Sequence, residues 1–204
     1  AIPPTSKEVG LLAQRIMIIT ISGPIGSGKT TIAIALSERF KLNHISAGYV
    51  FRSMAKEYKM NLQEFSKLAE ENPEIDKEVD RRQVALAKDG NVVIDGRLSA
   101  HLIKDADFKI WLKANIEERT RRVSIRENIV YEIALKETLE RENSERKRYR
   151  EIYNIYIDNL EPYDVVLNTE LWDVESIIKI IINIVTSSKM WMKPRREARQ
   201  TEKE

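Results

Sequence analysis

The sequence predicts an α/β protein, built on a doubly wound, five-stranded parallel sheet with helices on both faces. Short apolar runs alternate along the chain with longer segments of helical periodicity. The apolar runs are nearly continuous rather than alternating with polar residues, which is typical of parallel strands covered on both faces. Sheets of this kind bind ligands at the carboxyl ends of their strands, so we expect the functional residues there.

Five segments have the length and the β-branched or aromatic content of strands, and most are followed by polar or glycine residues. They are residues 16–21, 43–46, 92–95, 108–112 and 165–168. The segments between and after them have helical periodicity, at about 29–41, 47–58, 62–71, 74–89, 115–126, 129–157 and 173–188. Right-handed crossovers should join the parallel strands.

The length of 204 residues fits one domain, which we place at residues 16–189. Residues 1–15 are expected to be an N-terminal extension and residues 190–204 a charged tail. Basic residues at 193–196 could touch nucleic acid, but a solvated terminus is the favoured interpretation. No apolar run reaches the roughly 20 residues of a membrane span, and no signal-peptide pattern precedes the domain, so a cytoplasmic protein is expected.

The chain has no cysteine and two histidines, which excludes disulfides and thiolate-bound zinc. The strongest motif is Gly-Pro-Ile-Gly-Ser-Gly-Lys-Thr at residues 23–30, which matches the P-loop pattern between a predicted strand and a predicted helix. Backbone N–H groups of such a loop face phosphate oxygens, and the helix that follows adds its positive end. The predicted ATP-binding residues here are Gly23, Pro24, Ile25, Gly26, Ser27, Gly28, Lys29, Thr30 and Thr31.

Within this P-loop fold, Lys29 should supply positive charge near the β- and γ-phosphates, and the Thr30 hydroxyl should contact Mg²⁺. Asp95 ends an apolar strand beside the loop, where it could hold Mg²⁺ through water. A simple turn residue before Gly96 is the alternative for Asp95. No Asn-Lys-x-Asp motif is present, which speaks against a switch GTPase.

Arginines recur at helical spacings that place them on shared faces. Arg141, Glu145 and Arg148 lie at i, i+4 and i+7 of one predicted helix. Arg119, Arg122 and Arg126 lie at i, i+3 and i+7 of the preceding one, and Arg97 follows a strand end. Solvated ion pairs are the alternative, but phosphoryl transfer needs several cations around the moving group, so we expect some of these arginines to reach phosphates.

With these residues the chain resembles the nucleoside monophosphate kinases, and among them the cytidylate kinases of archaeal type, from about residue 17 to 185. The matching elements are the P-loop, Ser46-Ala47-Gly48-Tyr49-Val50-Phe51-Arg52, Asp80-Arg81-Arg82-Gln83, Asp95-Gly96-Arg97 and Arg141 with Arg148. Glu145 departs from the aspartate of the bacterial enzymes. Their large inserted domain is absent, and a helical arm at about 53–80 stands in its place.

The resemblance implies a set of acceptor-binding residues: Ser46, Gly48, Arg52, Asp95, Gly96, Arg97, Arg141, Glu145 and Arg148. Catalytic roles fall to Lys29, Arg97, Arg141 and Arg148, and a lid at about 119–141 would bring Arg119 and Arg122 to ATP. Ser46 could equally be a plain helix N-cap.

The implied activity is Mg²⁺-assisted transfer of a phosphoryl group from ATP to CMP or dCMP, by a monomer. An adenylate, uridylate or shikimate-type kinase is the nearest alternative. A non-catalytic, nucleotide-sensing protein that associates with RNA is the more distant one.

Overall fold

A computed structural model describes residues 17–188, so the predicted extension (1–15) and tail (190–204) lie outside the described residues. All five predicted strands are present and pair in parallel in the order β2-β3-β1-β4-β5. They are β1 Ile18–Ser22, β2 Asn43–Ser46, β3 Val92–Asp95, β4 Phe108–Lys113 and β5 Val165–Asn168. The doubly wound parallel sheet is therefore confirmed.

The helices match the predicted segments to within a few residues. They are α2 Lys29–Phe40, α3 Ala47–Glu57, α4 Leu62–Glu71, α5 Pro73–Ala87, α6 Ser99–Leu102, α7 Ile116–Glu127, α8 Tyr131–Tyr153 and α9 Val174–Thr186. The sequence did not predict α6, because a four-residue helix is too short to show a period. Helix α8 stops before the predicted residue 157, since Asn154 takes a left-handed conformation that ends it.

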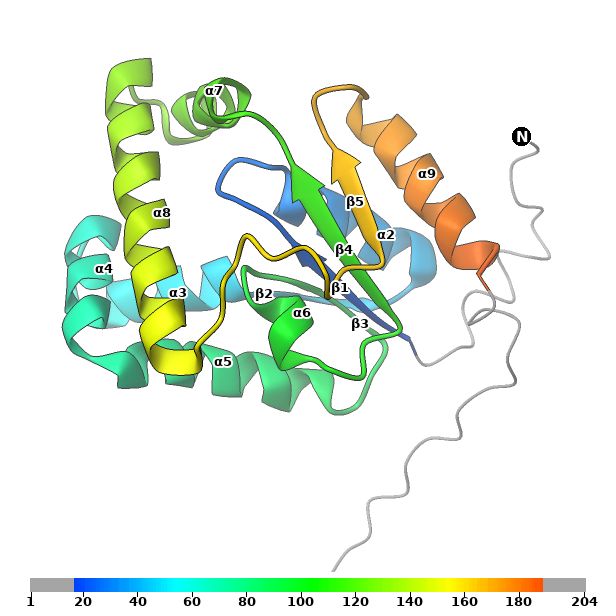
Figure 1. The fold of residues 1–204 in the computed structure, drawn as a ribbon, viewed down its shortest axis with the longest axis horizontal. Helices are drawn as coiled ribbons and strands as arrows, with labels where there is room; N and C mark the ends of the chain where they lie inside the picture. Colours follow the sequence, from blue (N-terminus) through cyan, green and yellow to red (C-terminus); the bar gives the residue numbers. More distant parts are fainter. Residues whose placement is uncertain (1–16, 189–204) are drawn as a thin grey trace, which may run out of the picture.

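The sheet is covered on both faces (Figure 1). On one face, α2 and α9 bury Leu36 and Ile181 against strand residues such as Ile19 and Leu112. On the other, α5 packs over β2 and β3, and α6 packs over β1. None of the helices within residues 17–188 combines the length and apolar character that a membrane span requires.

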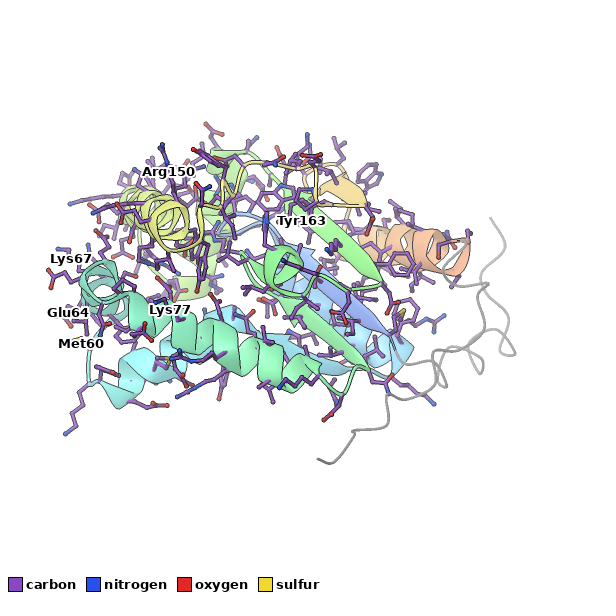
Figure 2. The ribbon with its side chains drawn as sticks, turned by 60° about the horizontal axis from the view of Figure 1, so that its bottom comes forward. Met60, Glu64, Lys67, Lys77, Arg150 and Tyr163 are labelled. Atoms are coloured by element: carbon purple, nitrogen blue, oxygen red, sulfur yellow. The ribbon has the colours of Figure 1, made fainter. Side chains whose placement is uncertain are left out.

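Helices α3, α4 and α5 include the segment 53–80 that is expected to be an arm, and they are called the arm below. They share a small core around Phe65 and Ile75. Figure 2 shows Met60, Glu64 and Lys67 at the outer end of the molecule, far from the sheet. The long helix α8 packs against both α4 of the arm and α7 (Figure 1). It therefore connects the arm to the carboxyl edge of the sheet, where α7 lies.

Candidate active site

The P-loop joins β1 to α2 and takes backbone conformations that favour glycine. Gly26 and Gly28 have φ angles of 77° and 90°, and a Cβ atom on Gly26 would lie 2.5 Å from the Arg119 carbonyl oxygen. Helix α2 begins at Lys29 without a side-chain cap. Its first N–H groups are thus available to a phosphate, as the sequence predicts.

Lys29 folds back over the loop, where its Nζ donates to the Pro24 carbonyl oxygen at 2.9 Å. Burial and, to a smaller extent, the nearby charge of Arg97 lower the pKa of the Lys29 ammonium to about 7. A phosphate placed beside Lys29 would oppose both effects, because negative charge favours the protonated ammonium.

Asp95 ends β3, and three side chains surround its carboxylate. Thr30 donates to Oδ2 at 2.8 Å, Ser46 donates to the same oxygen at 3.2 Å, and His44 Nε2 lies 2.6 Å from Oδ1. Ser46 also accepts from Tyr49 N, so its predicted N-cap role is confirmed. The contact with His44 was not predicted, because the two residues are 51 positions apart.

The donors around Asp95 fit a magnesium ion. A threonine hydroxyl and a carboxylate are hard oxygen ligands, and Mg²⁺ usually takes one or two of these and completes its shell with phosphates and water. Among residues 17–188 no group of three or more His, Cys, Asp or Glu side chains could hold a metal alone. Thr30 and Asp95 are therefore the residues suited to a magnesium–nucleotide complex.

The loop is braced from behind by Glu142 of α8 and Arg119 of α7. Glu142 is 3% exposed and accepts a hydrogen bond from Ile25 N at 3.1 Å. Arg119 Nη1 donates to the Ile25 carbonyl oxygen at 3.0 Å and to Glu142. The guanidinium of Arg119, which was predicted to contact ATP, is thus bound to protein atoms underneath the loop.

Arg122 lies at the other side of the loop. It donates to the Thr169 hydroxyl and carbonyl oxygens, both at 2.9 Å, and to the Gly26 carbonyl oxygen at 3.4 Å. This position is next to the phosphate-facing backbone, but the hydrogen bonds hold Arg122 against the β5 end rather than over the cleft.

A cleft opens between the P-loop, the arm and α8. Its cationic lining consists of Lys29, Arg52, Arg97, Arg126, Arg141 and Arg148. Neither Arg52 nor Arg141 forms a hydrogen bond or ion pair with any residue from 17 to 188. Burial lowers the pKa of both guanidinium groups, and the charge of Arg126 lowers each of them further. No carboxylate of residues 17–188 forms an ion pair with Arg52 or Arg141, so these two arginines beside the P-loop make the cleft a site for a second anion.

Arg97 and Glu145 meet on the floor of the cleft. Arg97 is 8% exposed, and its Nε lies 2.5 Å from Glu145 Oε2. Its Nη2 is buried without a hydrogen-bond partner among the described residues. Glu145 thus contacts a neighbouring arginine, and the Arg97 Nη2 donor is left for a ligand.

Acidic residues of α5 line the opposite wall. Asp76 accepts from Arg148 Nε at 2.6 Å, and Asp80 accepts from Tyr153 and from Gln83 at 3.2 Å. Burial raises the pKa of the Asp80 carboxyl to about 6. The motif at residues 80–83 thus contributes Asp80 and Gln83 to the cleft, while Arg81 and Arg82 pair with Glu78 on the exposed face.

Most of the predicted residues converge on this cleft. Those that line it are Ile25, Gly26, Lys29, Thr30, Gly48, Arg52, Asp95, Gly96, Arg97, Arg141, Glu145 and Arg148. Sequence reasoning missed the roles of Glu142, His44 and Asp76. Glu142 was detectable in principle, because it shares a helix face with Glu145, three residues along.

Known proteins resemble this chain over most of its length. A protein from Methanocaldococcus jannaschii named cytidylate kinase is 53% identical over 177 residues, 85% of this chain and 99% of that one. One of the same name from Pyrococcus horikoshii is 50% identical over 165 residues, 81% of this chain and 86% of its own. A structure of shikimate kinase from Acinetobacter baumannii with shikimate superposes with a TM-score of 0.58, at 14% identity, and covers 89% of this chain and 98% of its own.

The last of these likenesses shows the fold alone, and together with the glycine-rich loop it places the chain in the class of P-loop kinase folds. Within that class, the chain belongs to the cytidylate kinase-like family, whose model matches residues 18–171. The match includes the P-loop, the arm and α8.

Replacement of Glu142 by alanine should destabilise the protein and lower the affinity of the P-loop for ATP. Arg119 would be left buried without its counter-ion, which costs about 3–5 kcal/mol of the free energy of unfolding. Urea unfolding measures that loss, and the KM for ATP should rise with it. Glu140→Ala is the matched control on the exposed face of α8 and should change stability by less than about 0.5 kcal/mol. Equal effects of the two variants would contradict the bracing role.

Asp80→Asn should stabilise the protein in a pH-dependent way. The folded-state pKa of about 6 lies above the ordinary aspartate pKa of 3.8, so between these pH values the folded state holds a proton that the unfolded state releases. Wild-type stability is therefore lost as the pH rises from about 4 to about 6. The Tm advantage of Asp80→Asn should grow across this interval and level off above it. Asp158→Asn, at an exposed ion pair, is the control, and a pH-independent difference would refute the assignment.

Proposed function

We propose that the chain is a cytidylate kinase, which transfers the γ-phosphoryl group of ATP to CMP and dCMP. One observation carries this proposal: within residues 17–188, Arg52 and Arg141 form no ion pair, and both line a cleft beside the P-loop lysine. The relatives of about 50% identity that bear the name cytidylate kinase support the choice of acceptor.

ATP would bind with its phosphates against the P-loop and the first turn of α2. Lys29 would exchange its hydrogen bond to the Pro24 carbonyl oxygen for contacts with the β- and γ-phosphates. The negative charge of the phosphates would favour the protonated ammonium more than the site without ligand does. Thr30 and Asp95 would hold Mg²⁺, the latter through water, and the ion would supply charge neutralisation between the phosphates.

The acceptor would place its monophosphate among Arg52, Arg97 and Arg141. An ionised oxygen of that phosphate attacks the γ-phosphorus in line, a new P–O bond forms, and the bond to the β–γ bridging oxygen breaks. The bond electrons leave with ADP, so no side chain needs to take a proton from the nucleophile. The arginines and Lys29 stabilise the charge on the transferring group.

Movement of two segments would exclude water during transfer. We propose that residues 53–80 act as the acceptor-binding arm and residues 119–141 as a lid whose Arg119 end stays fixed under the P-loop, because Arg52, Arg126 and Arg141 lie where these segments meet the cleft. Such closure would suppress wasteful ATP hydrolysis.

A shikimate-type acceptor is the principal alternative, given the likeness of fold. Shikimate carries one carboxylate. The cleft holds Arg52 and Arg141, which form no ion pair within residues 17–188, and Arg97, whose Nη2 has no hydrogen-bond partner among those residues. A dianionic monophosphate uses these donors more fully. The cationic cleft therefore favours a nucleotide acceptor.

ADP formation from ATP and Mg²⁺ should be strongly stimulated by CMP and dCMP and weakly by UMP, AMP, GMP or shikimate. A coupled spectrophotometric assay measures the stimulation, and chromatography of the nucleotides should show CDP appearing in step with ADP. Stimulation mainly by AMP or shikimate would overturn the proposed acceptor. A lack of stimulation by any of them would overturn the kinase, and binding to RNA would then be tested.

Arg141→Met should lower kcat/KM for CMP by at least about 100-fold, because a charge that stabilises the moving phosphoryl group is removed. The KM for ATP should stay within about threefold, since Arg141 lies on the acceptor side. Arg146→Met removes an arginine of the same helix that pairs with Asp158 on the surface, and it should leave both parameters unchanged. A comparable loss in both variants would contradict the placement of Arg141.

A further inference from the structure

A buried ion pair between the arm and α8 forms part of the cleft wall. Asp76 of α5 and Arg148 of α8 are each 4% exposed, and Arg148 Nε donates to Asp76 Oδ2 at 2.6 Å. Both side chains line the cleft that contains Lys29 and Arg141. The pair is therefore accessible to a ligand from one side only.

Stability alone accounts poorly for such a pair. Desolvation of two buried charges offsets most of their attraction, so an apolar pair of similar volume would serve packing as well or better. Arg148 donates from Nη1 to the Ser66 carbonyl oxygen and to Ser144, which fixes the guanidinium in one orientation. Oδ1 of Asp76 and Nη2 of Arg148 are the polar atoms that these hydrogen bonds do not use.

The surroundings of the pair suit a flat aromatic ligand. Phe51 lies beneath the Arg148 guanidinium, with its ring centroid 5.9 Å from the Arg148 Cζ. Val79 and Tyr149 line the same part of the cleft. Apolar and aromatic walls with a fixed polar edge are the usual composition of a base-binding pocket.

We propose that Asp76 and Arg148 together read the amino edge of the acceptor base, and so select cytosine over uracil. This inference rests on the proposed function and deepens it. Asp76 Oδ1 accepts from the exocyclic N4 amino group, and Arg148 Nη2 donates to the neighbouring N3 or O2 acceptor.

The order of donors and acceptors explains the selectivity. Cytosine presents an amino donor at position 4 and an acceptor at N3, which complements a carboxylate beside a guanidinium. Uracil presents an O4 acceptor and an N3–H donor, so a carboxylate would face an oxygen and a guanidinium would face a hydrogen. The mismatch leaves buried charged groups without partners, which is an effective way to reject an analogue. Adenine presents the same order as cytosine, so the pair discriminates against uracil and leaves purines to the shape of the cleft.

The contact can be tested with the wild-type protein and a substrate analogue. Pyrimidin-2-one riboside monophosphate is CMP without the amino group. We expect its kcat/KM to be lower than that of CMP by about 10- to 100-fold, which is the discrimination that one well-formed hydrogen-bonding contact to a base provides. Equal kcat/KM values for CMP and the analogue would overturn the inference.

Asp76→Asn identifies the residue responsible. The amide oxygen of asparagine turns to Arg148, which can only donate, and the amide NH₂ then faces the base. The preference for CMP over UMP should fall at least about tenfold, and the penalty for the analogue should shrink by a similar factor, with the KM for ATP unchanged. Asp158→Asn, which also removes a carboxylate charge from an arginine partner, should leave both ratios at their wild-type values.

Asp80→Asn tests whether Asp80, one turn along α5 from Asp76, reads the base in place of the Asp76–Arg148 pair. Both ratios should stay close to wild type in Asp80→Asn, because Asp80 is already occupied by Tyr153 and Gln83. A change in the ratio of kcat/KM for CMP to that for UMP in Asp80→Asn but not in Asp76→Asn would assign base recognition to Asp80 and overturn the inference. A protein that phosphorylates no pyrimidine monophosphate at all would instead refute the proposed function.

Discussion

The concentration of positive charge at one edge of the sheet is the constraint on which the rest of the site depends. Arginines that face one another repel, and the repulsion is strong where water is excluded. Glu142 and Glu145 offset it from inside the protein, the first beneath the P-loop with Arg119 and the second beneath the cleft with Arg97. The two carboxylates thus fix Arg97 and Arg119, while Arg52 and Arg141, which form no ion pair in the described part of the chain, remain for the phosphates.

Helix α8 organises this arrangement because three of its residues contact three different parts of the site. Glu142 reaches the P-loop, Glu145 the segment after β3, and Arg148 the arm. The stretch of α8 from 142 to 148 therefore sets the distances between the ATP side and the acceptor side. Rigid placement of both substrates is the main contribution that a protein can make to phosphoryl transfer, which involves little acid–base chemistry.

The fold was predictable from the sequence because its strands are short, apolar and well separated by helical segments. The P-loop was predictable as well, since its residues are consecutive and each has a local role. The partners of Asp95 and Arg119 were not, because His44 and Glu142 reach them from positions 51 and 23 residues away. The spacing of Arg141 and Arg148 shows a shared face, but only the packing of α8 against the arm brings Asp76 to Arg148. Three-dimensional contacts of this kind depend on tertiary packing, which periodicity does not encode.

The central claim is that one cleft holds ATP and a pyrimidine monophosphate together, with their phosphates in line. A bisubstrate analogue in which adenosine and cytidine are joined through five phosphates tests it most directly. We predict inhibition that is competitive with both ATP and CMP, together with tighter binding in calorimetry than either nucleotide shows alone. Inhibition competitive with ATP only, and no gain in affinity over ATP, would show that the acceptor does not bind in this cleft.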